Sequence, residues 1–290
     1  MTDVHLWVAG ARPRTLGAAI APVVVGTAAA HHAVGATSWG RATLALVVAL
    51  GMQIGVNYAN DYSDGVRGTD RDRKGPVRLT ATGLATPRAV ATASGVAFLV
   101  AAAAGLALAA LVSWWLIVVG AAAIVAALGY TGGPRPYGYR GFGEVMVLVF
   151  FGFVATAGSA FVQLERVPAT AWWGSVTVGL LASAILVANN VRDLDTDTAS
   201  GKRTLAVRLG STRARALYVA CIVGSFLAVA PSALDAPWVL LALLAIPLAL
   251  PPTRVVLHAR EVPALVGALV ATARLEVVVA VLLGIGLWIS

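Results

Sequence analysis

The chain has 290 residues, a formal net charge of +8 and a single cysteine, and 59% of its residues are hydrophobic while only 12% are charged. A soluble domain usually has about 25% charged residues, so the composition excludes an ordinary soluble protein and predicts a membrane protein. Because Cys221 is alone, an intramolecular disulfide is also excluded. In a membrane protein an excess of Lys and Arg indicates sidedness rather than nucleic-acid binding, so no nucleic-acid partner is expected.

Apolar stretches near the length of a transmembrane helix, about 20 residues, recur along the whole chain. There are nine, and in chain order they span 15–33, 41–60, 87–110, 113–131, 143–163, 169–190, 213–231, 236–252 and 270–289. The eighth is short and ends at Pro251 and Pro252. We therefore expect an all-α integral membrane protein with about nine transmembrane helices in a bundle, forming one domain over residues 1–290.

Lys and Arg are unevenly divided between the segments that join these helices. If the N-terminus lies inside, 19 of the 21 Lys and Arg residues fall in inner segments, and only Arg41 and Arg166 fall outside. This asymmetry predicts a bacterial-type inner membrane protein with a cytoplasmic N-terminus and an outer C-terminus. The inner connections at about 61–86 and 191–212 are also the long ones, so we expect them to be cap loops over a cytoplasmic working face.

Two of the apolar stretches end in similar clusters of acids and amides. Asn60, Asp61 and Asp64 end the second stretch, and Asp193 and Asp197 end the sixth. A spacing of four residues places Asn60 beside Asp64, and Asp193 beside Asp197, on one side of a helix. Ionisable groups at a membrane helix are costly and usually mark function, so we expect the catalytic residues to be Asp61, Asp64, Asp193 and Asp197.

The chemistry that fits these acids is the binding of magnesium together with a phosphate compound. Magnesium takes oxygen ligands and is commonly held by one or two carboxylates plus substrate phosphates. Ion pairs with nearby arginines are the structural alternative for the same acids. Basic residues that follow each cluster would bind the remaining oxygens of a diphosphate, although contact with anionic lipid is also open for them. The candidates for diphosphate binding are Arg67, Lys74, Arg78, Lys202 and Arg203.

Further polar residues could line a pocket beside this site. Gln53 and Asn57 extend the polar column deeper into the second helix, where they either line a water-filled cavity or bond a neighbouring helix. The Gly- and Pro-rich segment before residue 141 carries Tyr139 and Arg140. Its tyrosines could be interfacial anchors or could face a cationic intermediate. With Asn190, these residues form the expected acceptor or cation pocket.

The acidic clusters resemble the two acidic motifs of the UbiA superfamily of intramembrane aromatic prenyltransferases. Residues 60–83, 130–144 and 189–210 are similar in more detail to the branch that prenylates 1,4-dihydroxy-2-naphthoate in menaquinone synthesis, and 11–27 is a weaker match. Together these segments cover roughly a quarter of the chain. The chain departs from the superfamily pattern at Gly68 and Asn190, where an acid would be expected.

The resemblance implies a reaction and a ligand set. Two Mg²⁺ ions, for which Mn²⁺ could substitute, would be held by Asn60, Asp64, Asp193 and Asp197 and would bind the diphosphate of a polyprenyl diphosphate. The polyprenyl chain would pass to 1,4-dihydroxy-2-naphthoate with loss of CO₂ and diphosphate, giving demethylmenaquinone. Tyr139 would shield the allylic cation and Arg140 would hold the acceptor. Another aromatic acceptor such as 4-hydroxybenzoate is the first alternative, and a membrane transporter is the alternative of another class.

Overall fold

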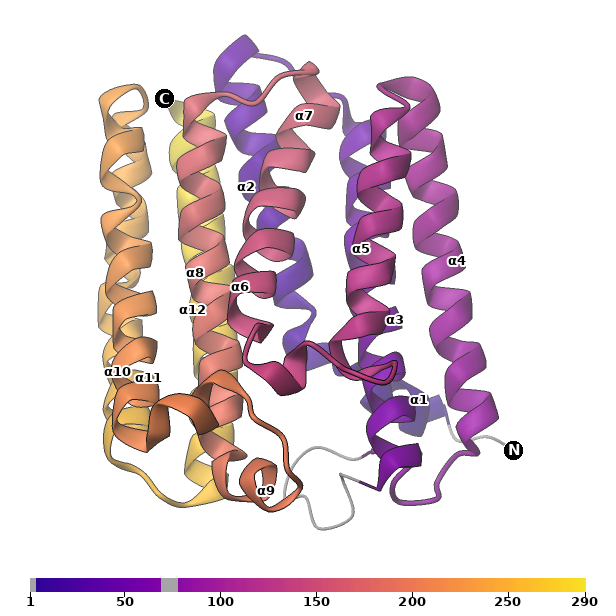
Figure 1. Ribbon diagram of the computed structural model, residues 1–290. Coiled ribbons are helices and arrows are strands. Elements are labelled where there is room, and N and C mark those ends of the chain that lie inside the picture. The colour runs from indigo at the N-terminus through magenta and orange to yellow at the C-terminus, as the bar shows by residue number, and fades with distance from the viewer. Residues whose placement is uncertain (1–3, 69–77) are drawn as a thin grey trace.

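The computed structural model describes residues 4–68 and 78–290, which form a bundle of long helices and contain no strand (Figure 1). Within these residues, eight helical passages are long and apolar enough to cross a membrane, and Trp115–Thr131 is a shorter apolar helix. The prediction of an all-α membrane protein is confirmed, and the expected count of about nine helices is close to what these residues show.

The passages follow the chain in the expected order. Their bounds are α2 Gly17–Val34, α3 Trp39–Arg67, α4 Pro87–Leu111, α5 Trp115–Thr131, the composite passage α6 Gly143–Val147, π-helical η3 Leu148–Ala157 and α7 Gly158–Leu164, then α8 Ala169–Arg192, α10 Leu205–Leu227, η5 Pro237–Ala245 with α11 Ile246–His258, and α12 Val262–Ile289. Short elements lie between or before them: α1 Val4–Ala11, η1 Pro13–Thr15, η2 Gly138–Arg140, α9 Leu194–Ala199 and η4 Ala230–Leu234.

Several boundaries differ from the sequence prediction, and the two segments expected as cap loops differ most. Helix α3 runs on to Arg67, beyond the expected end at residue 60, so the first acidic cluster lies on the helix, as its four-residue spacing predicted. The second connection contains α9 and the first turn of α10, which is set off by a break at Gly210 with φ 75°. Helix α12 begins at Val262, and Pro251 and Pro252 lie inside α11 rather than at its end. Polar residues hid these helix ends because hydropathy detects only the apolar part of a helix.

The end of α3 explains the glycine at position 68. Gly68 has φ 73°, a left-handed conformation, and its N–H bonds back to the carbonyls of Asp64 and Gly65. This is a common helix terminus that glycine adopts without steric cost. An acidic side chain, as expected from the superfamily pattern, would be strained at this φ, so the glycine ends the helix directly after the acidic cluster.

Helix α8 packs against α2, η3, α10 and α12, and small residues let some of these neighbours approach it closely. A Cβ added to Gly179 would lie 2.8 Å from the Cα of Gly152 in η3, and one added to Gly152 would lie 2.7 Å from the Ser175 carbonyl oxygen. Without a hydrophobic effect between lipid-embedded helices, such close packing is a main source of association. The buried core accordingly contains many alanines and valines from α2, α8 and α12.

The two ends of the bundle differ in what they carry. Helix α1, the end of α3 and helix α9 lie at one end, whereas α12 finishes at the other, where the C-terminus is marked (Figure 1). The acidic ends of α3 and α8 therefore share one end of the bundle. Segments more than a hundred residues apart in the chain meet there.

Candidate active site

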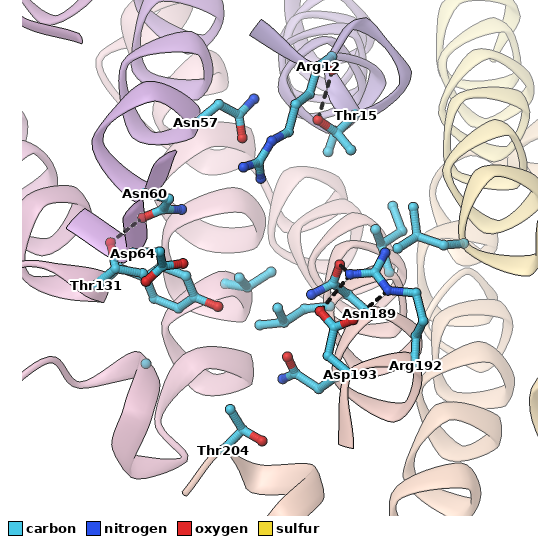
Figure 2. Close-up of a pocket in the computed structure, with 18 of the residues that line it drawn as sticks. Arg12, Thr15, Asn57, Asn60, Asp64, Thr131, Asn189, Arg192, Asp193 and Thr204 are labelled. Carbon is cyan, nitrogen blue, oxygen red and sulfur yellow. Dashed lines mark hydrogen bonds and ion pairs between the residues drawn. The ribbon is translucent and has the colours of Figure 1, made fainter. Parts of the chain in front are cut away.

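A cavity of about 230 Å³ lies between the acidic ends of α3 and α8. Its walls also include η1, the end of α5, the η2 turn and the segment just before α10, and its apolar lining includes Val147, Phe151 and Leu269. Figure 2 shows Asn60 and Asp64 on one side of the cavity and Asn189 and Asp193 on the other. The chain thus brings its two acidic clusters together around one space.

On the α3 side, both polar residues are held by neighbours from the α5–η2 region. The Thr131 hydroxyl donates a hydrogen bond to Asn60 Oδ1 at 2.7 Å, and the Tyr139 hydroxyl donates to Asp64 Oδ1. Asn60 and Asp64 are buried. A spacing of four residues on α3 turns both toward the cavity, so the helix and the η2 turn together fix the positions of these two predicted metal ligands.

On the opposite side, the end of α8 presents Asp193 with an arginine partner. Arg192 donates to both carboxylate oxygens of Asp193 at 2.6 Å and to Asn189 Oδ1 at 2.8 Å. Asp197 lines the same cavity from α9, and its backbone carbonyl accepts from the Lys202 amide at 2.9 Å. The bidentate pair offsets the cost of burying Asp193.

Two further cations meet the first cluster. Arg78 Nη2 and Lys202 Nζ each lie 3.6 Å from Asp64 Oδ2, and both residues are buried and line the cavity. Lys202 Nζ also lies 4.8 Å from the centre of the Tyr139 ring. Two of the five predicted diphosphate ligands are therefore in the cavity wall.

Two other predicted diphosphate ligands, Arg67 and Arg203, do not line the cavity. Arg67 is exposed and donates to the carbonyls of Thr131 and Gly133, so it ties α3 to the segment after α5. The Arg203 side chain is exposed, and its backbone amide donates to the Tyr139 carbonyl at 2.9 Å. Lys74 lies outside the described residues. Sequence proximity to the acids therefore did not distinguish arginines that reach the cavity from those that brace its surroundings.

Asp61 is separated from the other acids expected to be catalytic. Its two carboxylate oxygens accept hydrogen bonds from the backbone amides of Leu79 and Thr80 at 2.8 and 2.9 Å, it is 1% exposed, and it does not line the cavity. Next to Asn60 on a helix, Asp61 points about 100° away. These two hydrogen bonds hold the segment that carries Arg78 against α3, and a catalytic role for Asp61 stays a prediction.

The predicted acceptor pocket is only partly assembled. Gln53, Asn57, Tyr139 and Asn190 line the cavity, whereas Arg140 is exposed and does not. Asn57 Nδ2 donates to the Ala11 carbonyl at 3.0 Å, and Asn190 Nδ2 donates to Glu144 Oε1 at 2.8 Å. The polar column on α3 therefore both lines a cavity and bonds a neighbouring segment, which are the two alternatives that its sequence left open.

A neighbouring tyrosine adds rigidity to the η2 segment. The rings of Tyr130 and Tyr137 pack edge to face with centroids 5.5 Å apart. Burial raises the pKa of Tyr137 to about 12, so this hydroxyl stays neutral at physiological pH. Tyr139, two residues on, is thereby presented from a packed turn rather than from a loose loop.

Sequence reasoning missed several residues of the cavity wall. They are Arg12, Thr15, Thr131, Asn189, Arg192 and Thr204. Arg12 adopts φ 55°, an uncommon left-handed conformation for a non-glycine residue, and the η1 turn that follows it turns Arg12 and Thr15 toward the site (Figure 2). The similarity of residues 11–27 to the prenyltransferase pattern pointed to this segment of the chain. It did not assign a function to Arg12.

The chemistry of the donor set fits magnesium held jointly by protein and substrate. Among residues 4–68 and 78–290, no group of three or more His, Cys, Asp or Glu side chains is close enough to enclose a metal. Instead, Asn60 and Asp64 face Asp193 and Asp197 across the cavity. Sparse carboxylate and amide oxygens that leave room for substrate phosphates are the arrangement that magnesium uses.

These features define a class of protein: a multi-span helical membrane protein with opposed acidic helix ends and cationic side chains around one cavity. Sequence comparison narrows the class. Residues 19–264 match the UbiA prenyltransferase family, and the chain belongs to this family. The resemblance inferred from the acidic segments is thereby confirmed.

Individual relatives agree with this assignment. The 1,4-dihydroxy-2-naphthoate octaprenyltransferase of Mycobacterium leprae (strain TN) is 51% identical over 269 residues, which are 91% of this chain and 89% of that protein. The apo structure of a UbiA homolog from Aeropyrum pernix K1 has a TM-score of 0.69 at 17% identity and covers 94% of this chain and 97% of its own. A UbiA homolog from Archaeoglobus fulgidus bound to GPP and Mg²⁺ has a TM-score of 0.63 at 15% identity, with 96% and 99% covered.

Proposed function

We propose that this protein transfers a polyprenyl chain from polyprenyl diphosphate to 1,4-dihydroxy-2-naphthoate, with loss of CO₂ and diphosphate, in menaquinone biosynthesis. The observation that carries the proposal is the cavity in which Asp64 faces Asp193 and Asp197, with Arg78 and Lys202 in its wall. The identity of the acceptor is supported by the relative that is 51% identical to this chain and is named for the same naphthoate.

In this reaction magnesium would be held by four residues, Asn60, Asp64, Asp193 and Asp197. We expect two ions, and Mn²⁺ could substitute for Mg²⁺. Bound there, magnesium supplies charge neutralisation of the leaving diphosphate. Arg78 and Lys202 already lie 3.6 Å from Asp64, so each can turn from the carboxylate to a phosphate oxygen with a short movement. Arg12 lines the cavity from η1 and adds a third cation for the diphosphate.

Departure of diphosphate leaves an allylic cation, and the electron-rich naphthoate ring attacks it at the carbon that bears the carboxylate. A carbon–carbon bond forms, CO₂ leaves, and the aromatic ring is restored as the hydroquinone form of demethylmenaquinone. The Tyr139 hydroxyl donates a hydrogen bond to Asp64, and Lys202 Nζ lies over the Tyr139 ring. Tyr139 therefore positions both the Asp64 carboxylate and the Lys202 ammonium group. Asn190 and Asn57, on opposite sides of the cavity, can hydrogen-bond the acceptor.

The same proposal includes location. The polyprenyl donor and the apolar helix surfaces place the reaction in a lipid bilayer, and the Lys and Arg distribution supports a bacterial inner membrane with the N-terminus and the active site cytoplasmic and the C-terminus outside. A transporter is no longer favoured, because the family to which the chain belongs is one of prenyltransferases.

Product analysis with purified full-length protein tests the function. The protein is incubated with magnesium, a polyprenyl diphosphate and either 1,4-dihydroxy-2-naphthoate or 4-hydroxybenzoate, and products are identified by mass spectrometry. We expect a prenylated, decarboxylated naphthalene product, and no product after chelation of divalent metal. Prenylation of 4-hydroxybenzoate alone would replace the proposed acceptor, and full activity in chelator would refute the metal role.

A further inference from the structure

Glu144 is a buried acid that lies beside the active-site cavity without lining it. It is the second residue of α6 and is 7% exposed. Its Oε1 accepts a hydrogen bond from Asn190 Nδ2 at 2.8 Å, whereas its Oε2 is buried and has no partner within the described part of the chain. A single hydrogen bond does not offset the cost of burying a carboxyl group with one bare oxygen. Stability therefore does not account for an acid at this position.

The backbone around Glu144 is fixed against α8. The Ser183 hydroxyl is shared between the carbonyl oxygens of Gly179 at 2.8 Å and Glu144 at 3.3 Å. A Cβ added to the preceding residue, Gly143, would lie 3.2 Å from Leu186 Cδ2, so the two segments are in close contact. Glu144 thus extends from a packed helix end, and its bond to Asn190 determines how the Asn190 side chain is turned.

The bond to Glu144 decides which atom of Asn190 is available to a ligand. A side-chain amide has donors on its nitrogen and an acceptor on its oxygen. Asn190 lines the cavity while its Nδ2 is directed to Glu144. Among the described residues, no group donates to Asn190 Oδ1, and this oxygen is not closed off by protein atoms. Asn190 therefore offers the cavity an acceptor, which suits a ligand hydroxyl and repels a ligand carboxylate.

Asn57 is arranged in the same way on the opposite wall, where Figure 2 shows it facing the cavity. Its Nδ2 donates to the Ala11 carbonyl at 3.0 Å, and its Oδ1 has no hydrogen bond in the described part of the chain. Each amide comes three residues before a predicted metal ligand, Asn57 before Asn60 and Asn190 before Asp193, which is about 4.5 Å along a helix. Because α3 and α8 both run toward the active-site end (Figure 1), both acceptor oxygens lie further inside the bundle than the expected metal.

We propose that Glu144 is a positioning residue for the aromatic acceptor, a role that rests on the function proposed above. By holding the amide nitrogen of Asn190, Glu144 directs Asn190 Oδ1 to a hydroxyl group of the acceptor ring. The ring has to lie beside the allylic carbon, on the membrane side of the diphosphate. Asn190 lines the cavity on that side together with the apolar side chains of Leu186 and Phe151. A hydroxyl bound by Asn190 fixes which edge of the ring faces the allylic carbon.

Steady-state kinetics of the purified full-length protein test this role. Glu144→Leu removes the acceptor for the Asn190 amide, so Asn190 can turn a donor toward the ring. We expect the KM for 1,4-dihydroxy-2-naphthoate to rise about tenfold, the effect of one lost hydrogen bond, while the KM for the polyprenyl diphosphate and the Tm stay near their native values. Glu144→Gln keeps an oxygen for Asn190 and should have a KM close to the native one. Changes in both KM values and in Tm would indicate a merely structural role and overturn the proposal.

A double-mutant cycle tests whether Glu144 acts through Asn190. Asn190→Ala removes the group that binds the hydroxyl and should raise the same KM at least as much as Glu144→Leu does. Adding Glu144→Leu to Asn190→Ala should have no further effect, because the two residues act through one contact. Additive increases would contradict the proposal. If Glu144→Leu does not fold, Glu144→Met, which also lacks an acceptor oxygen, takes its place in both experiments.

An acceptor analogue separates the hydroxyl contact from the rest of the ring. 2-Naphthoate has the carboxylate and no hydroxyl group, and it is used as an inhibitor competing with 1,4-dihydroxy-2-naphthoate. Its inhibition constant should be the same in the native protein and in Glu144→Leu, because it has no hydroxyl to donate to Asn190. A tenfold weaker inhibition in the variant would show that Glu144 acts on ring shape or on the carboxylate, which would refute the hydroxyl contact.

A control variant and the native protein complete the comparison. Glu261→Leu makes the same substitution at an exposed glutamate that does not line the cavity, and it should show native kinetics. A native KM for the naphthoate in an active Glu144→Leu protein would overturn the role of Glu144 alone. Absence of any prenylated naphthalene product from the native protein would overturn the proposed function and this role with it.

Discussion

Asp64 makes polar contacts with three other residues of the cavity wall. It accepts from Tyr139 on one oxygen and faces Arg78 and Lys202 at 3.6 Å on the other. A buried carboxylate with two cations is stable as an ion cluster, but its place opposite Asp193 across a cavity is not needed for stability. This excess of charge at a space large enough for a ligand is the residue-level sign of function.

Asp64→Asn and Asp193→Asn should each lower kcat by at least about a hundredfold, because each removes a charge that would hold magnesium and the diphosphate. Mass spectrometry of the product gives the rate, and a Tm close to that of the native protein shows that the fold is retained. Asp195→Asn is the matched control, since Asp195 is exposed on α9 and does not line the cavity. Comparable loss in the control, or native turnover in both active-site variants, would contradict the assignment.

Asp61 and Asp64 belong to one motif but make different contacts. Its carboxylate binds the amides of Leu79 and Thr80, and this places Arg78 at the cavity. Asp61→Ala should lower the free energy of unfolding by about 1–3 kcal/mol, because two buried amides lose their acceptor. Thermal unfolding measures this. Asp61→Asn, which keeps one acceptor oxygen, should recover part of the loss, and unchanged stability in Asp61→Ala would rule out the anchoring role.

At the scale of elements, the site depends on how closely α8 can approach the composite passage from Gly143 to Leu164. Gly152 and Gly179 face each other at that crossing, and the passage is π-helical from Leu148 to Ala157. Wide helical turns of this kind are frequent at functional sites. Here the turn carries Phe151 into the cavity wall.

Gly179→Ala should destabilise the protein by about 1–3 kcal/mol, since the new Cβ would meet Gly152 Cα at 2.8 Å and Leu148 Cδ1 at 2.7 Å and would force the helices apart. The midpoint of thermal unfolding in detergent reports the change. Gly158→Ala, in the same passage, is the control because a Cβ there would meet nothing within 4 Å. If both variants had the same Tm as the native protein, close approach of the helices at this crossing would not contribute to stability.

At the scale of the whole molecule, the distribution of Lys and Arg should decide which end of the bundle faces the cytoplasm. The single cysteine, Cys221, is buried, so it should react poorly with a membrane-impermeant maleimide, and cysteines can be added at chosen ends. In spheroplasts, Ala36→Cys should be labelled, whereas Ala199→Cys near the cavity should be labelled only after lysis, because the active-site end carries most of the Lys and Arg. The opposite pattern would invert the proposed topology.

The sequence by itself determined that this is an all-α membrane protein and where the apolar cores of its helices lie. It did so because the bilayer demands long apolar stretches whatever their neighbours are. It also identified Asn60, Asp64, Asp193 and Asp197, because acids and amides stand out at the ends of such stretches. All four line the cavity, and their functional roles stay predictions until the variants are measured.

The tertiary structure alone decided which of the surrounding polar residues reach the cavity. Arg78 is brought in by the bonds that Asp61 makes, and Arg12 by the turn at η1, whereas Arg67 turns to carbonyls after α5 and Arg140 stays exposed. The direction of a long side chain at a helix end depends on partners that are distant in sequence, and no local pattern encodes those partners. The bounds of the helices also depended on features that hydropathy does not detect. Gly68 and Gly210 act through backbone geometry, and Pro251 and Pro252 lie inside α11.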